Sequence, residues 1–358
     1  MLFSAKPKGF FVELSDHGCL FASTSNTGSG GLLIEGLEES PVGDADLFAQ
    51  ALDKLQPKKA PSGYVHAICG LYPAKRLLRR ATIDPKRAKE PAYFSEFMTQ
   101  QFRIEPDKYS MAVLNSSDGE DFDPNKSSQK EVLFCGLPGD DIVSIQDGLL
   151  TNGIYPERVE LGSVSLLGAL VDYLAFKKSK VPTLVLEIGT DITHTFIVTA
   201  AGVEAARPIP QGLDAMIPVV QKELNLKDEE SARKLFFSNT FDFTGLGPLL
   251  VKRLLKELQS SIGFYEVQTG QSVGQLFCSM LPSKLGWLDG TIANSLGVPG
   301  LTIDVAAWLQ SRDITLAPAA AASGTNPRWF GLYSLMANYQ ADAAAAPAPN
   351  GVISEKKG

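Results

Sequence analysis

The chain contains the same short series of elements twice, about 170 residues apart. In each copy two apolar segments joined by a polar turn predict a β-hairpin, a third predicts another strand, and an amphipathic helix follows. The copies cover 10–55 and 184–224. Because this spacing is far longer than a solenoid repeat, the pattern predicts two similar α/β domains facing a cleft. The alternative is that a common supersecondary unit recurs by chance.

A segment of different character lies between the two copies. Its mixture of short strands and helices predicts a small α+β domain inserted into the first half of the chain. The end of the chain, "ADAAAAPAPNGVISEKKG", is of low complexity and predicts a disordered tail. The predicted boundaries are 1–72 and 151–180 for the first domain, 73–150 for the insertion, 181–340 for the second domain with a smaller subdomain at 213–268, and 341–358 for the tail.

Charge and composition exclude several classes of protein. The formal charge of −7 and the pI near 5.2 argue against a nucleic-acid partner. The four cysteines are far apart, which favours free thiols over a zinc site or a disulfide framework. No apolar run is long enough for a spanning helix, and the first residues do not have the pattern of a signal peptide. We therefore expect a cytoplasmic protein.

Common catalytic and metal-binding motifs are absent from the sequence. It has no G-K-[ST] loop, no G-x-G-x-x-G turn and no G-x-S-x-G elbow. His17, His66 and His194 have no metal-ligand spacing, so we predict no catalytic residue and no metal site. The basic cluster "KRLLRR", 75–80, has two interpretations. It is either solvated charge beside a strand, or a contact for an acidic peptide or anionic lipid headgroups.

Four stretches carry a resemblance to a known family. They are "LLTNGIYPERVELGSVSLLGAL", "LVLEIGTDITHTFIV", "RPIPQGLDAMIPVVQKELNLKDEESARKL" and "LLKELQSSIGFYEVQTGQSVGQLFCS". Their order and spacing resemble the PilM family of type IV pilus assembly proteins, cytoplasmic relatives of the cell-division protein FtsA in the actin-like ATPase superfamily. The resemblance implies an α/β fold of actin-like (ribonuclease H-like) duplicated domains around a cleft, with an inserted small α+β domain as in FtsA.

The resemblance also implies a role and partners. Members of this family resemble a clamp on the N-terminal cytoplasmic peptide of PilN, an inner-membrane protein. We therefore expect a scaffold that is peripheral at the inner membrane through a PilN-like partner and other type IV pilus alignment components.

The family's nucleotide site is altered at every element that this sequence should supply. The first phosphate hairpin has Glu13 and Ser15 where the family has aspartate and glycine, and the second has Glu187 before Gly189. Thr190 and Thr193 can still offer hydroxyl groups. In the adenosine loop, the family's three glycines are replaced by larger residues: Met280, Leu281 and Pro282. A side chain at such positions takes space that a phosphate or an adenosine needs.

These changes predict a degenerate actin-like ATPase, a pseudo-ATPase without ATP or Mg²⁺. Three alternatives stay open at this point. One is a working ATPase in which Glu13 and Glu187 replace aspartates at the metal, a second binds nucleotide without turning it over, and a third is a sugar kinase, for which no catalytic aspartate can be named.

Overall fold

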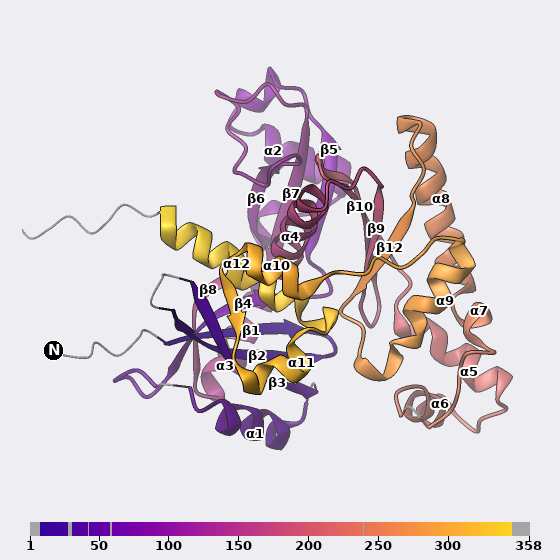
Figure 1. Ribbon diagram of the computed structural model, residues 1–358. Coiled ribbons are helices and arrows are strands. Elements are labelled where there is room, and N and C mark those ends of the chain that lie inside the picture. The colour runs from indigo at the N-terminus through magenta and orange to yellow at the C-terminus, as the bar shows by residue number, and fades with distance from the viewer. Residues whose placement is uncertain (1–7, 28–30, 42, 58, 239, 346–358) are drawn as a thin grey trace, which may run out of the picture.

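The computed structural model describes residues 8–345, except 28–30, 42, 58 and 239. The described chain forms three sheets, of six, four and three strands (Figure 1). The six-stranded sheet has the order β13-β3-β2-β1-β4-β8. Its strands are β1 (Lys8–Ser15), β2 (Gly18–Asn26), β3 (Leu32–Pro41), β4 (Val65–Leu71), β8 (Ile154–Leu161) and β13 (Ile314–Leu316).

The first predicted hairpin and its third strand form the antiparallel part of this sheet. β1 pairs with β2 from Lys8↔Ser25 to Ser15↔Gly18, and β2 pairs in turn with β3. The other three neighbours, β4, β8 and β13, join in parallel. Alternate side chains of β1 face opposite sides, as the period of a strand requires. Phe10 and Val12 enter one core cluster, and Phe11 enters another.

Helices cover both faces of the six-stranded sheet. On the face of Phe10 lie α1 (Ala45–Leu55) and α3 (Gly139–Thr151), which contribute Ala51 and Leu149 to the core. The side chain of Asp44 caps α1 by accepting a hydrogen bond from the backbone N–H of Leu47. The opposite face packs against four helices: α4 (Gly162–Phe176), α10 (Val305–Ser311), α11 (Pro318–Gly324) and α12 (Phe330–Ala345).

The four-stranded sheet contains the second predicted hairpin and has the order β11-β10-β9-β12. Its strands are β9 (Thr183–Ile188), β10 (Thr193–Thr199), β11 (Gly202–Ile209) and β12 (Gln275–Ser279). One face contributes Val185 and Phe196 to the same core cluster as the α4–α12 side of the first sheet. The helical layer of α4 and α12 therefore lies between the two large sheets (Figure 1).

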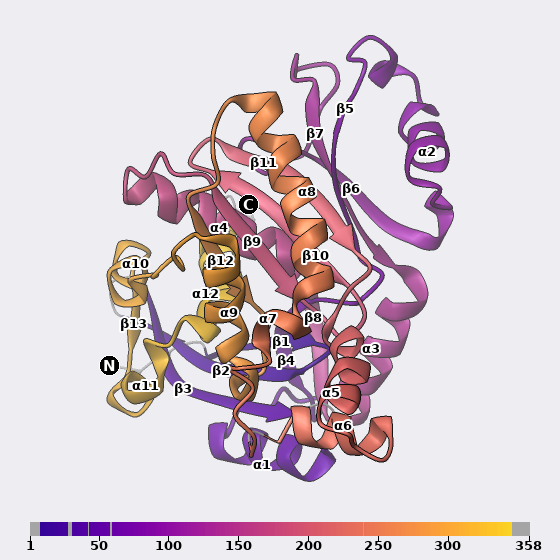
Figure 2. The same ribbon diagram turned by 90° about the vertical axis from the view of Figure 1, so that its right-hand side faces the viewer.

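The other face of the four-stranded sheet packs on a second set of helices. Leu184, Leu186 and Ile197 point into this core cluster. Figure 2 shows the helices on the side facing the viewer. They are α5 (Ile217–Glu223), α6 (Glu229–Phe236), α7 (Gly247–Leu250), α8 (Lys252–Thr269) and α9 (Trp287–Leu296), together with the 3₁₀ turns η4 (Leu213–Met216) and η5 (Ser283–Leu285).

The third sheet belongs to the segment between the two copies and has the order β5-β7-β6. Its strands are β5 (Leu77–Thr82), β6 (Tyr109–Asn115) and β7 (Glu131–Pro138). An aromatic cluster covers it, in which the Phe97 and Phe134 rings stack 5.2 Å apart. The covering elements are η1 (Arg87–Lys89), α2 (Tyr93–Phe97), the π-helical turn η2 (Met98–Phe102) and η3 (Pro106–Lys108).

The C-terminal part of the chain departs from the predicted second domain, 181–340. β13 pairs in parallel with β3 of the first sheet, and α12 packs on α4. The predicted tail also starts too early, because α12 continues to Ala345; residues 346–358 lie outside the described part. Hydropathy predicts the last helix, but it does not show the short strand β13 or which of two sheets that strand joins. Another 3₁₀ turn, η6 (Pro327–Trp329), leads into α12.

No helix in the described ranges is both long enough and apolar enough to cross a membrane.

Candidate functional site

The turns of the two hairpins contact each other directly. The Nε2 atom of His17, in the β1–β2 turn, lies 2.8 Å from the backbone oxygen of Ile188 in β9. The carboxylate of Asp16 accepts a hydrogen bond of 3.3 Å from the backbone N–H of Thr190. A Cβ atom built on Gly189 would lie 3.1 Å from Oδ2 of Asp16. The two turns that the resemblance assigns to phosphate binding therefore contact each other directly.

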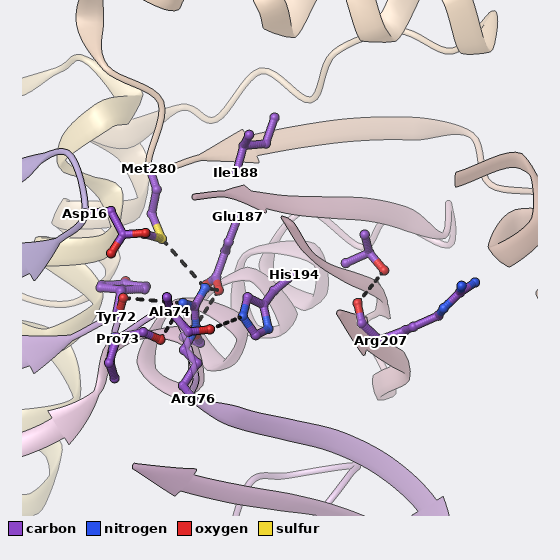
Figure 3. Close-up of polar contacts among 12 residues, drawn as sticks. Asp16, Tyr72, Pro73, Ala74, Arg76, Glu187, Ile188, His194, Arg207 and Met280 are labelled. Atoms are coloured by element: carbon purple, nitrogen blue, oxygen red, sulfur yellow. Dashed lines mark hydrogen bonds and ion pairs between the residues drawn. The ribbon is translucent and has the colours of Figure 1, made fainter. Parts of the chain in front are cut away.

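Beside these turns, a buried arginine joins the two halves of the molecule. Nη2 of Arg76, between β4 and β5, donates to Oε2 of Glu187 at 2.6 Å (Figure 3). Both side chains are removed from solvent, with exposed fractions of 3% and 0%. At the first residues of α4, Ser163 accepts from Nε of Arg76 at 2.9 Å and donates to Oε2 of Glu187 at 2.6 Å. Strand, linker and helix thus converge on one carboxylate.

The remaining nitrogen of the guanidinium is bound by backbone. Nη1 of Arg76 donates to the carbonyl oxygens of Tyr72 at 3.4 Å and Pro73 at 3.1 Å. The guanidinium carbon lies 5.6 Å from the centre of the Tyr72 ring, within range of a cation–π contact. The planar guanidinium can make all of these contacts at once, which the ammonium group of a lysine could not do.

The other predicted acidic residue, Glu13, is buried in the same region but makes different contacts. Its Oε2 atom occupies the space where a Cβ on Gly331 would stand, so the side chain lies against the start of α12. Burial, together with the nearby charge of Glu187, raises the pKa of Glu13 to about 8, although Arg328 acts in the opposite direction. Glu13 and Glu187 therefore lie near each other, but their side chains contact different residues.

The predicted adenosine loop begins where β12 ends. Ser279 pairs with Glu187 in the parallel β12–β9 ladder, and Met280 follows directly. Met280 has a φ of +62°, a backbone conformation that favours glycine. Its sulfur lies 3.9 Å from Nη2 of Arg76 (Figure 3). Leu281 packs against the core of the second sheet, and Pro282 precedes η5.

The three predicted hydroxyl residues bond to backbone or lie at the contact between the turns. The hydroxyl of Ser15 donates to the Gly18 carbonyl at 3.4 Å, within its own turn. The hydroxyl of buried Thr193 donates to the Gln211 carbonyl at 2.6 Å. Thr190 uses its N–H for Asp16, and its carbonyl accepts from the N–H of Asp214 at 2.9 Å. These contacts stabilise the turns themselves.

A buried histidine borders the arginine. Nε2 of His194 in β10 lies 3.4 Å from the carbonyl oxygen of Ala74, which requires the tautomer with a proton on Nε2 for a hydrogen bond. Burial and the positive charges of Arg76 and Arg79 lower the pKa of His194 to about 3. Burial also lowers the pKa of His17. Both rings are therefore neutral at physiological pH.

The residues present do not fit a magnesium nucleotide between the turns. Mg²⁺ demands oxygen ligands in near-ideal octahedral geometry. Oε2 of Glu187 already accepts from Arg76 and Ser163, and the guanidinium would repel a divalent cation at this distance. Oε1 of Glu187 has no hydrogen-bond partner among the described residues. Throughout the described ranges, no group of three or more His, Cys, Asp or Glu side chains is placed to hold a metal ion.

Sequence reasoning missed Arg76, Ser163 and Tyr72. Arg76 belongs to the basic cluster 75–80, and both interpretations of that cluster placed it at the surface. This was wrong for Arg76, which is buried. Arg80 is partly exposed and pairs with Glu131 at 3.1 Å and with Glu204 at 3.8 Å. Arg76 could have been suspected because Glu13 and Glu187 lie within apolar strands, and a buried carboxylate usually has a cation beside it.

No protein-family model matches the chain, and no curated protein matches it. Among solved structures, a chain of a PilM–PilN type IV pilus biogenesis complex is 16% identical, with a TM-score of 0.65 over 96% of this chain and 100% of that chain. A Bacteroides thetaiotaomicron protein of unknown function with an actin-like ATPase fold has a TM-score of 0.43 and 11% identity, over 83% and 91% of the two chains.

The ethanolamine utilization protein EutJ from Carboxydothermus hydrogenoformans has a TM-score of 0.45 and 10% identity, over 93% of this chain and 90% of that chain. At such identities a likeness shows the fold. The predicted fold class is confirmed: this chain has the actin-like α/β fold, in the form that it shares with a chain of the PilM–PilN complex.

Proposed function

We propose that this chain is a PilM-like scaffold of type IV pilus assembly that binds the N-terminal cytoplasmic peptide of a PilN-like inner-membrane protein. The likeness to the PilM–PilN complex over 96% of the chain supports the role. In this proposal the chain is cytoplasmic, reaches the inner membrane through its partner, and contacts other pilus alignment components.

The same proposal treats the chain as a pseudo-ATPase that uses neither ATP nor Mg²⁺. The observation that carries this part is the ion pair of 2.6 Å between Arg76 and Glu187. The guanidinium of Arg76 lies beside the carboxylate that would have to bind a metal ion in an ATPase. The direct contact of Asp16 with Thr190 supports it from the other side of the same region. We infer that the nucleotide site has become a structural joint between the two domains.

We place the partner peptide at the junction of the first and inserted domains. There α3 runs from β7 of the inserted sheet to β8 of the first sheet. Val143 on α3 is 57% exposed, and Asp140 and Asp141 stand in the first turn. An exposed apolar side chain beside two carboxylates suits a peptide with an apolar residue and a positive charge, such as the amino group of a chain's N-terminus.

The test is binding of the synthetic N-terminal peptide of the PilN-like protein from the same genome, measured by calorimetry. We expect Val143→Asp to weaken binding at least about tenfold, or about 1.4 kcal/mol. The matched control is Val267→Asp on α8, because Val267 is 87% exposed and lies on another part of the molecule. Absence of binding to this peptide, and to every inner-membrane pilus component in a pull-down, would contradict the proposal.

An ATP-binding protein of pilus assembly is the second candidate. It is favoured by Oε1 of Glu187, a buried acceptor without a hydrogen-bond partner in the part of the chain that the structure describes. For a nucleotide to enter, the two turns would have to separate and Arg76 would have to leave Glu187. That rearrangement would leave the buried carboxylate of Glu187 without its cation, so this candidate ranks below the scaffold.

A further inference from the structure

A groove with an apolar floor lies on the second domain, away from α3. Its cavity volume is about 330 Å³. It lies between α5 on one side and α7 with the first turn of α8 on the other, and Gln211 and Gly212 also line it. The buried side chains of Met216, Leu250 and Leu254 line its floor, and Leu249, which is 40% exposed, lines it as well. The groove can therefore accept an apolar side chain from outside.

More positive than negative side chains line the groove. Lys222, Lys252 and Arg253 line it, against the single carboxylate of Glu223. All three cations are exposed, and none forms an ion pair with any residue in the described ranges. The whole chain carries a formal charge of −7, so a cationic groove stands out against an acidic molecule. Opposite charge would attract and orient an acidic ligand here.

The shape of the groove separates the possible acidic ligands. A membrane surface requires a broad basic face, whereas these cations surround a concave apolar site. A nucleotide base usually stacks on an aromatic ring, and no aromatic side chain is among the lining residues. A groove between two helices with an apolar floor and charged rims is the usual site for an amphipathic peptide segment.

We propose that this groove binds an acidic, amphipathic segment of a partner protein, with an apolar side chain between α5 and α7 and carboxylates on Lys222, Lys252 and Arg253. The site is separate from the α3 surface that we assign to a PilN-like peptide. It does not rest on the pilus function, because the groove and its charges are properties of this chain.

The probe is a short fluorescein-labelled peptide of glutamate and leucine. A lysine–leucine peptide of equal length is the control with the opposite charge. We expect the full chain to bind the acidic peptide in an anisotropy titration, to bind it more weakly as salt is raised, and not to bind the basic one. Lys252→Glu with Arg253→Glu should weaken binding at least about tenfold. Lys89→Glu, an exposed lysine in the inserted domain, is the matched control and should leave the affinity unchanged.

Two further measurements locate the site. Ala215→Trp fills the cavity without changing charge and should also abolish binding, and amide exchange of the wild-type chain should slow in 215–223 and 249–256 when peptide is added. The proposal is overturned if the acidic peptide does not bind, if the charge reversal has no more effect than Lys89→Glu, or if protection appears elsewhere. Charge-dependent binding to phosphatidylserine vesicles without binding to the peptide would identify a lipid surface instead and would also overturn it.

Discussion

Arg76 and Glu187 are 111 residues apart in sequence, yet their side chains meet at 2.6 Å in the interior of the molecule. Arg76 follows a strand of the first sheet, and Glu187 lies within a strand of the second sheet. Ser163 at the start of α4 bonds to both side chains. The three residues form a polar joint between the first sheet, the central helical layer and the second sheet.

Removal of the arginine should destabilise the fold strongly. Arg76→Ala leaves the carboxylate of Glu187 buried without a cation, and loss of one partner of a buried ion pair costs about 3–5 kcal/mol. The measurement is the free energy of unfolding in urea. The control is Arg80→Ala, whose ion pairs with Glu131 and Glu204 are partly exposed; it should cost less than about 1 kcal/mol. If both variants lower the free energy of unfolding equally, the buried pair stabilises the fold no more than the partly exposed one.

Replacing both partners of the pair should recover most of the lost stability. In Arg76→Met with Glu187→Leu, no buried charge remains, and apolar residues often replace a buried ion pair without loss of stability. We expect the double variant to be more stable than Arg76→Ala by at least about 2 kcal/mol. If the double variant is the less stable one, the interaction acts through Ser163 or the backbone rather than through the charge.

Stability should depend on pH through Glu13. Its pKa is raised from 4.5 to about 8, mainly by burial, so the folded state holds a proton that the unfolded state releases. This group has no effect below pH about 4.5, destabilises the fold progressively as pH rises toward 8, and reaches its full cost above that value. The shift corresponds to a cost of up to about 5 kcal/mol.

The measurement compares wild type with Glu13→Gln in urea at several pH values. The neutral amide keeps the shape of the protonated acid, so the variant should gain stability relative to wild type as pH increases. All other titrating groups are common to both proteins and cancel in the difference. A difference that is constant between pH 5 and 9 would contradict a raised pKa for Glu13.

Magnesium ATP at millimolar concentration should leave the melting temperature unchanged. A ligand that binds only the folded state stabilises it by about 2.7 kcal/mol at one hundred times its Kd, which a thermal scan detects readily. Magnesium alone and ATP with a chelator are the controls for ion effects. A rise that requires both Mg²⁺ and ATP would favour the second candidate function over the pseudo-ATPase.

A methyl group on Gly189 should force the two hairpin turns apart. The added Cβ would lie 2.9 Å from the backbone oxygen of Ile192 and 3.1 Å from the carboxylate of Asp16. We expect Gly189→Ala to destabilise the fold by about 1–3 kcal/mol in urea. Gly263→Ala is the control, because nothing lies within 4 Å of that added Cβ in α8. It should stabilise the chain by up to about 1 kcal/mol, since alanine favours the helix.

Local sequence patterns predicted the elements of this fold well. The alternation in β1 and the apolar face of α1 are visible in the sequence because each depends on neighbouring residues alone. The duplicated hairpins could be recognised for the same reason. The position of β13 at the edge of the first sheet depends on a pairing with residues 282 positions earlier, as in Ile314↔Leu32, and no local pattern encodes that choice.

The candidate site was predictable only in part. Glu13, Glu187 and Gly189 could be singled out because they occupy the positions of the two phosphate hairpins in the family that the sequence resembles. Arg76 lies in a basic cluster in which every cation looks equally exposed, so the sequence could not single it out. Met280 was recognised as bulky, but its left-handed backbone and its contact with Arg76 depend on how β12 ends beside β9.

The return of β13 and α12 to the first sheet has a consequence for biosynthesis. The first sheet lacks its edge strand and part of its covering layer until residues 314–345 leave the ribosome, because β13 and α12 follow the second sheet in the chain. The second sheet needs only residues 183–279, so it can assemble while the first remains incomplete. One face of the first sheet therefore stays partly uncovered until residues 314–345 have been synthesised, and chaperone binding is to be expected there.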